Sequence, residues 1–179
     1  MIDDPIIVGC GTVGASLAIR LAKEKVVSKL ELYDYDVVSN SKEDQYYPFV
    51  NTESGLSKVE VVQVLCNIED INLQVEIYKE QIIQPLKKIG FIIDCRDSKQ
   101  YYINSKVKIS LDGFTLYVDS LTRQSTYYEY HKYTVPRNEK YIHKAMDVIF
   151  NYLVTDLYLN RDFRIYNLET NKSEILETQ

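Results

Sequence analysis

A chain of 179 residues with 45% hydrophobic content is long enough to bury the core of one domain. Its net charge of -5 argues against nucleic acid or an anionic membrane surface as the main partner. No apolar run approaches the ~20 residues that span a bilayer, and no signal-peptide pattern precedes Pro5, so we expect a cytoplasmic protein that does not enter a membrane. Its three cysteines are widely spaced without a CxxC pair, which argues against a disulfide scaffold and a structural zinc site.

The first hundred residues alternate short apolar runs with helical patterns, which is typical of a parallel sheet with helices on its faces. We expect strands over Ile6–Val8, Leu30–Tyr33, Val75–Tyr78 and Phe91–Ile93. Helical patterns cover Val13–Lys23, Lys58–Ile68, a short piece at Ile82–Ile89, and Ser98–Lys106. The polar stretch Asn40–Ser57 is the longest irregular segment.

The remaining residues predict an antiparallel extension. The dipeptide Asp112-Gly113 is a hairpin signal between two apolar runs. We expect the strands Val107–Leu111 and Thr115–Val118, the amphipathic helix Glu139–Leu159, the strand Phe163–Tyr166 and a polar tail. Residues 121–137 are ambiguous between an edge strand and a loop that packs on a partner. The predicted fold class is α/β, with a Rossmann-like, doubly wound, mostly parallel sheet and an antiparallel C-terminal extension.

The strongest motif is the glycine turn that follows the first predicted strand. Gly9 lets the backbone turn sharply, Gly11 lets it approach a pyrophosphate, and Gly14 lets the next helix lie close to the strand. The N-terminal end of that helix would direct its free N–H groups and positive dipole at the phosphate. A GxGxxG turn in this context predicts a nucleotide site.

Three further residues could complete such a site, each with a simpler alternative. Asp34 ends the second strand, where a nucleotide fold places an acid against ribose hydroxyls, although it could be a plain surface acid. Lys58 could reach a triphosphate or stand as a solvated residue at a helix start. Asp97 could hold Mg²⁺ or cap the following helix. We expect Cys10 and Cys95 to be inert packing residues.

Four motifs occur in an order that resembles the ThiF/MoeB/HesA superfamily, the adenylating domains of ubiquitin-activating enzymes. They are the glycine turn, the "DxDxV…SN" segment Asp34–Asn40, the "GxxK" helix start Gly55–Lys58, and the "DCxD" strand end Asp94–Asp97. The late helix around Ala145–Leu153 and the closing strand Arg164–Asn167 also resemble the family. The resemblance covers nearly the whole chain as one pared-down domain, with a nucleotide-binding half over 1–106 and the hairpin, late helix and closing strand over 107–179.

The resemblance implies an activity and assigns roles to these residues. Gly9, Gly11, Gly14, Asn40 and Lys58 would contact phosphates of ATP, Asp34 the ribose, and Asp97 a Mg²⁺ ion bound through the phosphates, with Lys58 and Asp97 as the catalytic groups. The family activates the C-terminal glycine of a ubiquitin-like or sulfur-carrier protein as an acyl-adenylate and releases pyrophosphate. Its members work as homodimers or as heterodimers with a related subunit.

The sequence departs from the family pattern at its arginines. The arginine expected three residues after Asn40 falls on Glu43, or on Asp44 if one residue is inserted, and a second one falls on Gln100. No arginine occurs between Arg20 and Arg96, so no register restores the first. Loss of a cation beside a transferring phosphoryl group removes transition-state stabilisation of a few kcal/mol.

Three hypotheses therefore stay open. The chain could be an ATP-dependent adenylyltransferase, or a catalytically inactive scaffold or subunit of a larger complex that keeps the nucleotide site or only the fold. It could also be an NAD-dependent oxidoreductase, since the glycine turn and Asp34 fit that function equally well, although this leaves Lys58 and the Asp94–Asp97 segment unexplained.

Overall fold

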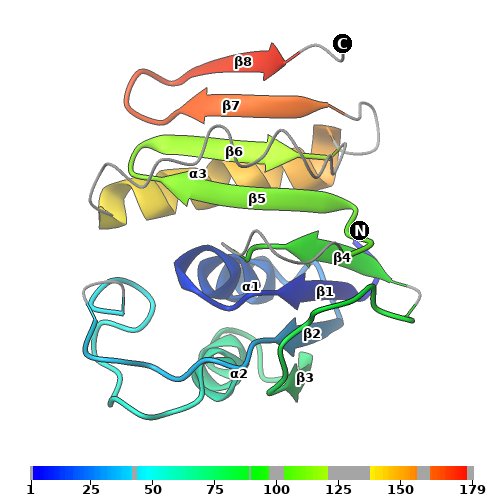
Figure 1. Ribbon diagram of the computed structural model, residues 1–179, viewed down its shortest axis with the longest axis vertical. Coiled ribbons are helices and arrows are strands. Elements are labelled where there is room, and N and C mark those ends of the chain that lie inside the picture. Colours follow the sequence, from blue (N-terminus) through cyan, green and yellow to red (C-terminus); the bar gives the residue numbers. More distant parts are fainter. Residues whose placement is uncertain are drawn as a thin grey trace.

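The computed structural model describes residues 2–41, 44–88, 90–96, 103–120, 138–156 and 162–176. They form one eight-stranded sheet with helices packed on it (Figure 1). The strands are β1 (Pro5–Val8), β2 (Lys29–Tyr33), β3 (Gln74–Tyr78), β4 (Phe91–Asp94), β5 (Val107–Asp112), β6 (Thr115–Asp119), β7 (Phe163–Asn167) and β8 (Lys172–Leu176). The helices are α1 (Thr12–Glu24), α2 (Lys58–Glu69) and α3 (Glu139–Asn151), which runs into a π-helical turn at Tyr152–Asp156.

The strand order is β3-β2-β1-β4-β5-β6-β7-β8, which confirms the predicted fold class. The first five strands of this order pair in parallel, and the pairs from β5 to β8 are antiparallel. The chain moves outward from β1 to β3 and then returns to place β4 on the other side of β1. This reversal makes the carboxyl ends of β1 and β4 a topological switch point, where open α/β sheets bind ligands.

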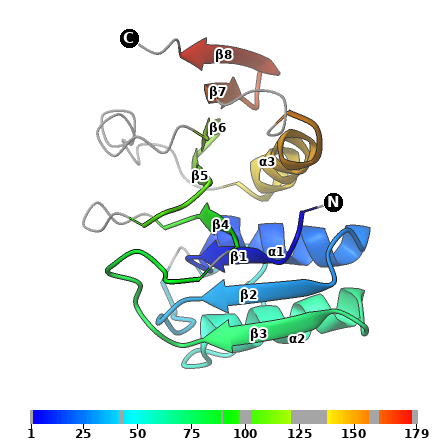
Figure 2. The same cartoon turned by 90° about the vertical axis from the view of Figure 1, so that its right-hand side faces the viewer.

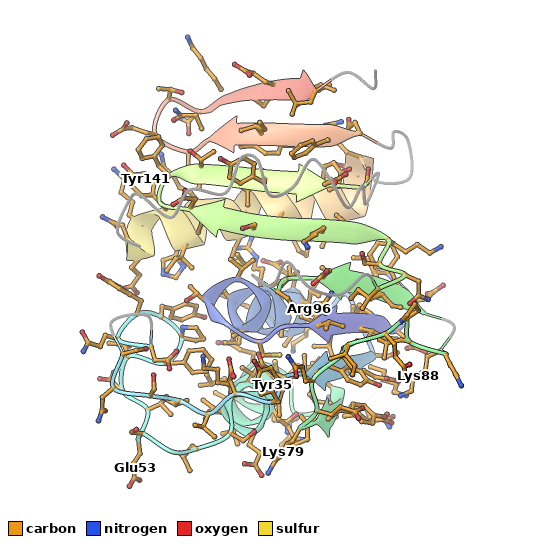
Figure 3. All side chains as sticks on the ribbon, viewed as in Figure 1. Tyr35, Glu53, Lys79, Lys88, Arg96 and Tyr141 are labelled. Atoms are coloured by element: carbon orange, nitrogen blue, oxygen red, sulfur yellow. The ribbon has the colours of Figure 1, made fainter. Side chains whose placement is uncertain are left out.

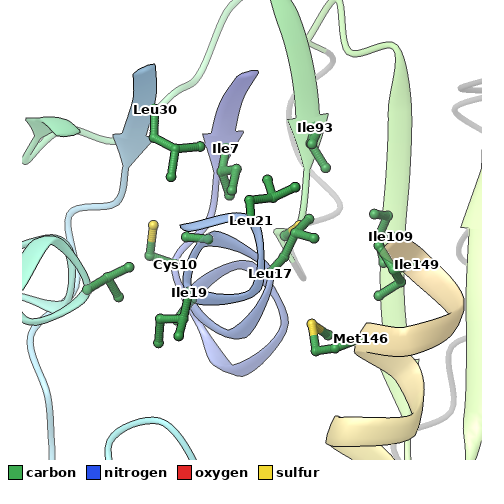
Figure 4. Packing of buried hydrophobic residues seen from close by; sticks show 14 of the residues in the cluster. Ile7, Cys10, Leu17, Ile19, Leu21, Leu30, Ile93, Ile109, Met146 and Ile149 are labelled. Carbon is green, nitrogen blue, oxygen red and sulfur yellow. The ribbon is translucent and has the colours of Figure 1, made fainter. Parts of the chain in front are cut away.

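The three α-helices of the described residues pack on one face of the sheet, with α1 between α2 and α3 (Figure 2). Side chains alternate along a strand, so Ile7 points into this core while its neighbours on β1 point to the other face. Figure 4 shows Leu17 and Leu21 of α1 between the strands and Met146 and Ile149 of α3. None of the helices in the described ranges is long and apolar enough to cross a membrane.

The opposite face of β1 and β4 carries a smaller cluster that an irregular connection covers. Ile6, Val8 and Ile92 pack there with Ile82 and Ile103. The predicted helix at 82–89 is therefore wrong over its described residues, 82–88, which form no helix. Pro85 lies in the middle of that segment, where it removes a helical hydrogen bond and disfavours helical backbone in the residue before it.

In the absence of helical hydrogen bonds, side chains donate to backbone carbonyls of this connection. The Arg96 guanidinium donates to the carbonyl of Ile82 at 2.7 Å, and the Asn104 amide donates to that of Leu86 at 3.2 Å. Of the helix predicted over Ser98–Lys106, residues 103–106 are described and are not helical, while 98–102 lie outside the described residues.

The predicted polar tail contains a strand that the sequence pattern does not reveal. β8 pairs with β7 along its whole length, from Asn167 with Lys172 to Phe163 with Leu176. Four of its five residues are exposed and Leu176 is partly exposed, so β8 shows no alternation of buried apolar and exposed polar residues. The turn before it is built locally: Asn171 adopts φ 57°, and the Asn167 side chain accepts hydrogen bonds from the amides of Glu169 and Thr170.

Shortening a core side chain of α3 should destabilise the whole domain. Ile149 is 0% exposed, so Ile149→Ala should lower the free energy of unfolding by about 2–5 kcal/mol, measured by urea titration. The matched control is Ile175→Ala on β8, where the side chain is 58% exposed and the loss should stay below about 1 kcal/mol. Equal losses at the two sites would contradict the packing of α3 on the sheet.

Candidate nucleotide-binding site

The glycine turn joins β1 directly to α1. Gly9 has φ 92°, a conformation that favours glycine, and its amide donates to the Tyr33 carbonyl at 2.8 Å. A Cβ atom on Gly14 would lie 1.9 Å from the Gly9 carbonyl oxygen, so α1 touches the turn backbone at this point. A Cβ on Gly11 would meet no atom of the described residues within 4 Å. The turn backbone is thus packed tightly against Gly14, whereas the space next to Gly11 is open.

Gly11 is also the N-cap residue of α1. Gly11 has no side chain that could cap this end of the helix, and no acidic residue lies in its first turn. Amides at a helix N-terminus can donate to an anion, and the helix dipole adds attraction for negative charge. Open space at Gly11 and these amides together suit a phosphate group.

Asp34 fastens the turn to the end of β2. One of its carboxylate oxygens accepts the Cys10 amide at 2.6 Å, and the other accepts the Asp36 amide at 2.8 Å. The side chain is buried, and burial raises its pKa. The two hydrogen bonds act in the opposite direction but do not cancel the effect of burial. Each carboxylate oxygen has a second lone pair, so the ribose contact predicted for Asp34 remains compatible with its position.

Lys58 begins α2 and is held by an acid from the preceding loop. Its Nζ lies 3.1 Å from Asp44 Oδ1 and 4.0 Å from Asp36 Oδ2, with the Phe49 ring centroid at 5.8 Å. The other Asp44 oxygen accepts the Ser39 amide at 2.7 Å and the Ser39 hydroxyl at 2.8 Å. The Lys58 charge therefore already has a buried carboxylate partner.

A second group of ion pairs lies at the end of β4, and the sequence analysis missed it. The Arg96 Nε donates to Asp94 Oδ1 at 2.9 Å, and Lys108 Nζ lies 3.7 Å from Asp94 Oδ2. Arg96 also lies against the turn, because a Cβ on Gly9 would be 2.9 Å from its Cγ (Figure 3). The Asp-x-Arg spacing at a strand end is the one signal that could have indicated this contact.

The structure brings some of the predicted residues together and leaves others apart or undescribed. Val8 is in register with both Tyr33 and Asp94, so the turn, Asp34 and Arg96 meet at one edge of the sheet. Asn40 is exposed in the loop, where its carbonyl accepts from the Gln45 side chain at 3.5 Å. Asp97 lies outside the described residues, so the predicted Mg²⁺ ligand stays a prediction. The described ranges contain no group of three or more potential metal ligands.

Comparison with solved structures assigns the fold. The chain matches PaaA with a TM-score of 0.66 and 15% identity, over 97% of this chain and 64% of PaaA. It matches E. coli MccB, solved with selenomethionine MccA, with a TM-score of 0.68 and 10% identity, over 97% of this chain and 63% of MccB. The chain has a ThiF-like fold.

The chain spans less than two thirds of the length of PaaA and of MccB. A third likeness, to E. coli tRNA N6-threonylcarbamoyladenosine dehydratase TcdA in complex with ATP, covers 55% of this chain and 42% of TcdA, with 22% identity and a TM-score of 0.49. At that score the likeness is too partial to inform the ligand of this chain. No family model and no curated protein matches the sequence.

The two glycines of the turn should respond differently to the same substitution. Gly14→Ala should lower the free energy of unfolding by about 3 kcal/mol or more, because its Cβ cannot fit beside the Gly9 carbonyl. Gly11→Ala should cost less than about 1 kcal/mol, since Gly11 has φ -69° and open space around it. Thermal and urea denaturation of both variants would test this. A severe loss in Gly11→Ala would contradict the open turn.

The cysteines should be unreactive in the folded chain. Cys10, Cys66 and Cys95 are all buried free thiols. Burial raises the pKa of Cys66 to about 12, and burial together with the Asp34 charge raises the pKa of Cys10, so neither forms the reactive thiolate near pH 8. We expect a chromogenic disulfide reagent to label none of them within minutes at pH 8, and all three in guanidinium chloride. Rapid labelling of Cys10 in the native chain would show that the turn region opens.

Proposed function

We propose that this ThiF-like chain binds ATP at the carboxyl edge of β1, β2 and β4 and uses it to adenylate the C-terminal glycine of a ubiquitin-like or sulfur-carrier protein. The observation that supports it best is the turn from Gly9 to Gly14, which is open at Gly11, lies at the N-terminus of α1 and is fixed by Asp34. This arrangement offers backbone donors and a positive dipole to phosphate oxygens, with a carboxylate nearby for a ribose.

In the proposed reaction, a carboxylate oxygen of the partner's C-terminus attacks the α-phosphorus of ATP. A new phosphorus–oxygen bond forms, the bond to the bridging oxygen of the β-phosphate breaks, and pyrophosphate leaves with that bonding pair. Gly11 and the α1 amides would hold phosphate oxygens, Asp34 would orient the ribose, and Asn40 would donate a hydrogen bond to a phosphate. Lys58 would neutralise phosphate charge once its contact with Asp44 opens. Mg²⁺ would arrive with ATP and offset charge on the phosphates, with Asp97 as its proposed ligand.

A polypeptide partner and a second subunit belong to the same proposal. E. coli MccB, which shares this fold, has been solved together with MccA, a peptide. We extend that kind of partner to this chain, which we take as one domain over 1–179, with the nucleotide site in 1–106. A homodimer, or a heterodimer with a related subunit, would supply in trans the arginine that this sequence lacks between Arg20 and Arg96.

One observation favours a second candidate function, that of a catalytically inactive subunit that binds nucleotide. Lys58 is paired with Asp44, the residue that falls on the expected arginine position in one register. A cation replaced by a carboxylate at that point weakens stabilisation of the departing pyrophosphate. The glycine turn and Asp34, which would hold the nucleotide, are unaffected by this change.

Calorimetric titration of the purified chain with Mg-ATP and with Mg-NAD, followed by ATP–pyrophosphate exchange, tests the proposal. We expect ATP binding that falls at least about tenfold in Gly11→Ala, because a methyl group there blocks phosphate approach without unfolding the turn. Exchange by the chain, alone or with a related subunit and carrier protein, would support the enzyme, and ATP binding without exchange would support the inactive subunit. Binding of NAD alone would overturn both.

A further inference from the structure

We infer that Asp44 sets the phosphate preference of the nucleotide site by holding the ammonium group of Lys58. The inference rests on the proposed function, because it concerns the same site. The bound carboxylate takes the place next to Lys58 that a β- or γ-phosphate would otherwise fill. The site is therefore built to accept a nucleoside monophosphate nearly as well as a triphosphate, until the Lys58–Asp44 contact opens.

The contact between Lys58 and Asp44 is short and buried. The Nζ–Oδ1 distance is 3.1 Å, and the exposed fractions of the two side chains are 11% for Lys58 and 5% for Asp44. Water screens such a pair weakly. A phosphate can therefore replace Asp44 as the partner of Lys58 only if it binds the ammonium group about as strongly as Asp44 does. Lys58 also lies beside the Phe49 ring, which limits the directions from which another anion can approach.

Asp44 stays charged and in place because Ser39 holds its second oxygen. Burial would raise the pKa of this carboxyl, but the Ser39 amide and hydroxyl and the Lys58 ammonium together hold it below its ordinary value. Asp44 is therefore ionised at neutral pH. Two of its three contacts come from Ser39, so they do not depend on Lys58 and would keep Asp44 in position when a nucleotide enters.

The loop that carries Asp44 is closed at its base. The Val38 amide donates to the Leu56 carbonyl, and the Gly55 amide donates to the Val38 carbonyl, both at 2.8 Å. Val37 and Ser57 form an antiparallel bridge at the same point. These contacts join the loop's two ends just before α2, so the loop presents Asp44 to Lys58 from a fixed base.

Lys58 is also linked to the glycine turn through a short series of contacts. Its amide donates to the Asp36 carbonyl at 3.1 Å, and the Asp36 amide donates to Asp34, which in turn accepts the Cys10 amide. A phosphate at Gly11 would thus meet Lys58 accompanied by the carboxylates of Asp44 and Asp36. Their summed charge is negative, so the additional phosphates of ATP gain little attraction there.

A double-mutant cycle on Asp44 and Lys58 tests the inference with metal-free ATP and AMP as ligands. Asp44→Asn keeps the size of the side chain and removes its charge, so the ratio of ATP to AMP affinity should rise at least about tenfold. Lys58→Met alone leaves the Asp44 carboxylate without its partner, so it should not raise the ratio, and in the Asp44→Asn background it should abolish the gain. The matched control is Asp36→Asn, which removes a half-exposed carboxylate 4.0 Å from Lys58 and should have a much smaller effect.

Two outcomes would overturn the inference. One is an unchanged ratio in a folded Asp44→Asn variant, with circular dichroism and melting temperature as the check on folding. The other is an ATP affinity of the native chain at least about tenfold above its AMP affinity, which would show that the site already prefers the triphosphate; this measurement needs no variant. If AMP still binds in either case, the proposed nucleotide site stands. If neither nucleotide binds the native chain, the proposed function fails and the inference fails with it.

Discussion

The contact between Gly14 and the Gly9 carbonyl determines where the rest of the structure can lie. With no side chain at either position, α1 rests directly against the end of β1 and lies in the middle of the helical layer. Both α2 and α3 pack on α1, so the position of this one helix fixes the position of its two neighbours on the sheet. The same contact aims the N-terminus of α1 at the switch point between β1 and β4. Packing and ligand geometry therefore share one cause.

Cations at this edge of the sheet share a second property. Lys58 is paired with Asp44, and Arg96 and Lys108 are both paired with Asp94. Positive charge in the described part of the edge is thus balanced by carboxylates of the same chain, and the attraction that a phosphate meets comes chiefly from backbone amides. Recognition by amides depends on shape and close approach more than on charge, which makes Gly11 the sensitive position.

Much of the fold could be predicted because its strands are apolar and its turns carry glycine. β1, β2 and the hairpin of β5 and β6 were all expected from such signals. The connection at 82–88 was misread because Ile82, Ile83 and Leu86 have helical spacing, while Pro85 prevents the helix. β8 was missed because an exposed edge strand has no apolar face to reveal it.

The sequence predicted which residues lie at the site better than it predicted which of them contact one another. The glycine turn and Asp34 meet as the motif spacing suggested. The pairing of Lys58 with Asp44 was not foreseen, since thirteen residues of irregular loop lie between them and no periodic pattern places them together. Asn40 is exposed in the same loop. Local patterns predict elements, whereas contacts across an irregular loop depend on tertiary structure.

The order of strands has a consequence for how the chain folds as it is synthesised. β1 acquires β2 as a neighbour within thirty-three residues, but its other edge is completed only when Phe91–Asp94 has been made. During that interval a short apolar strand would wait with one side unpaired, and such edges recruit other chains. Pro5 lies at its first position and offers no amide to a foreign strand. The brevity of β1 and its leading proline are thus suited to keeping a nascent chain apart from its neighbours.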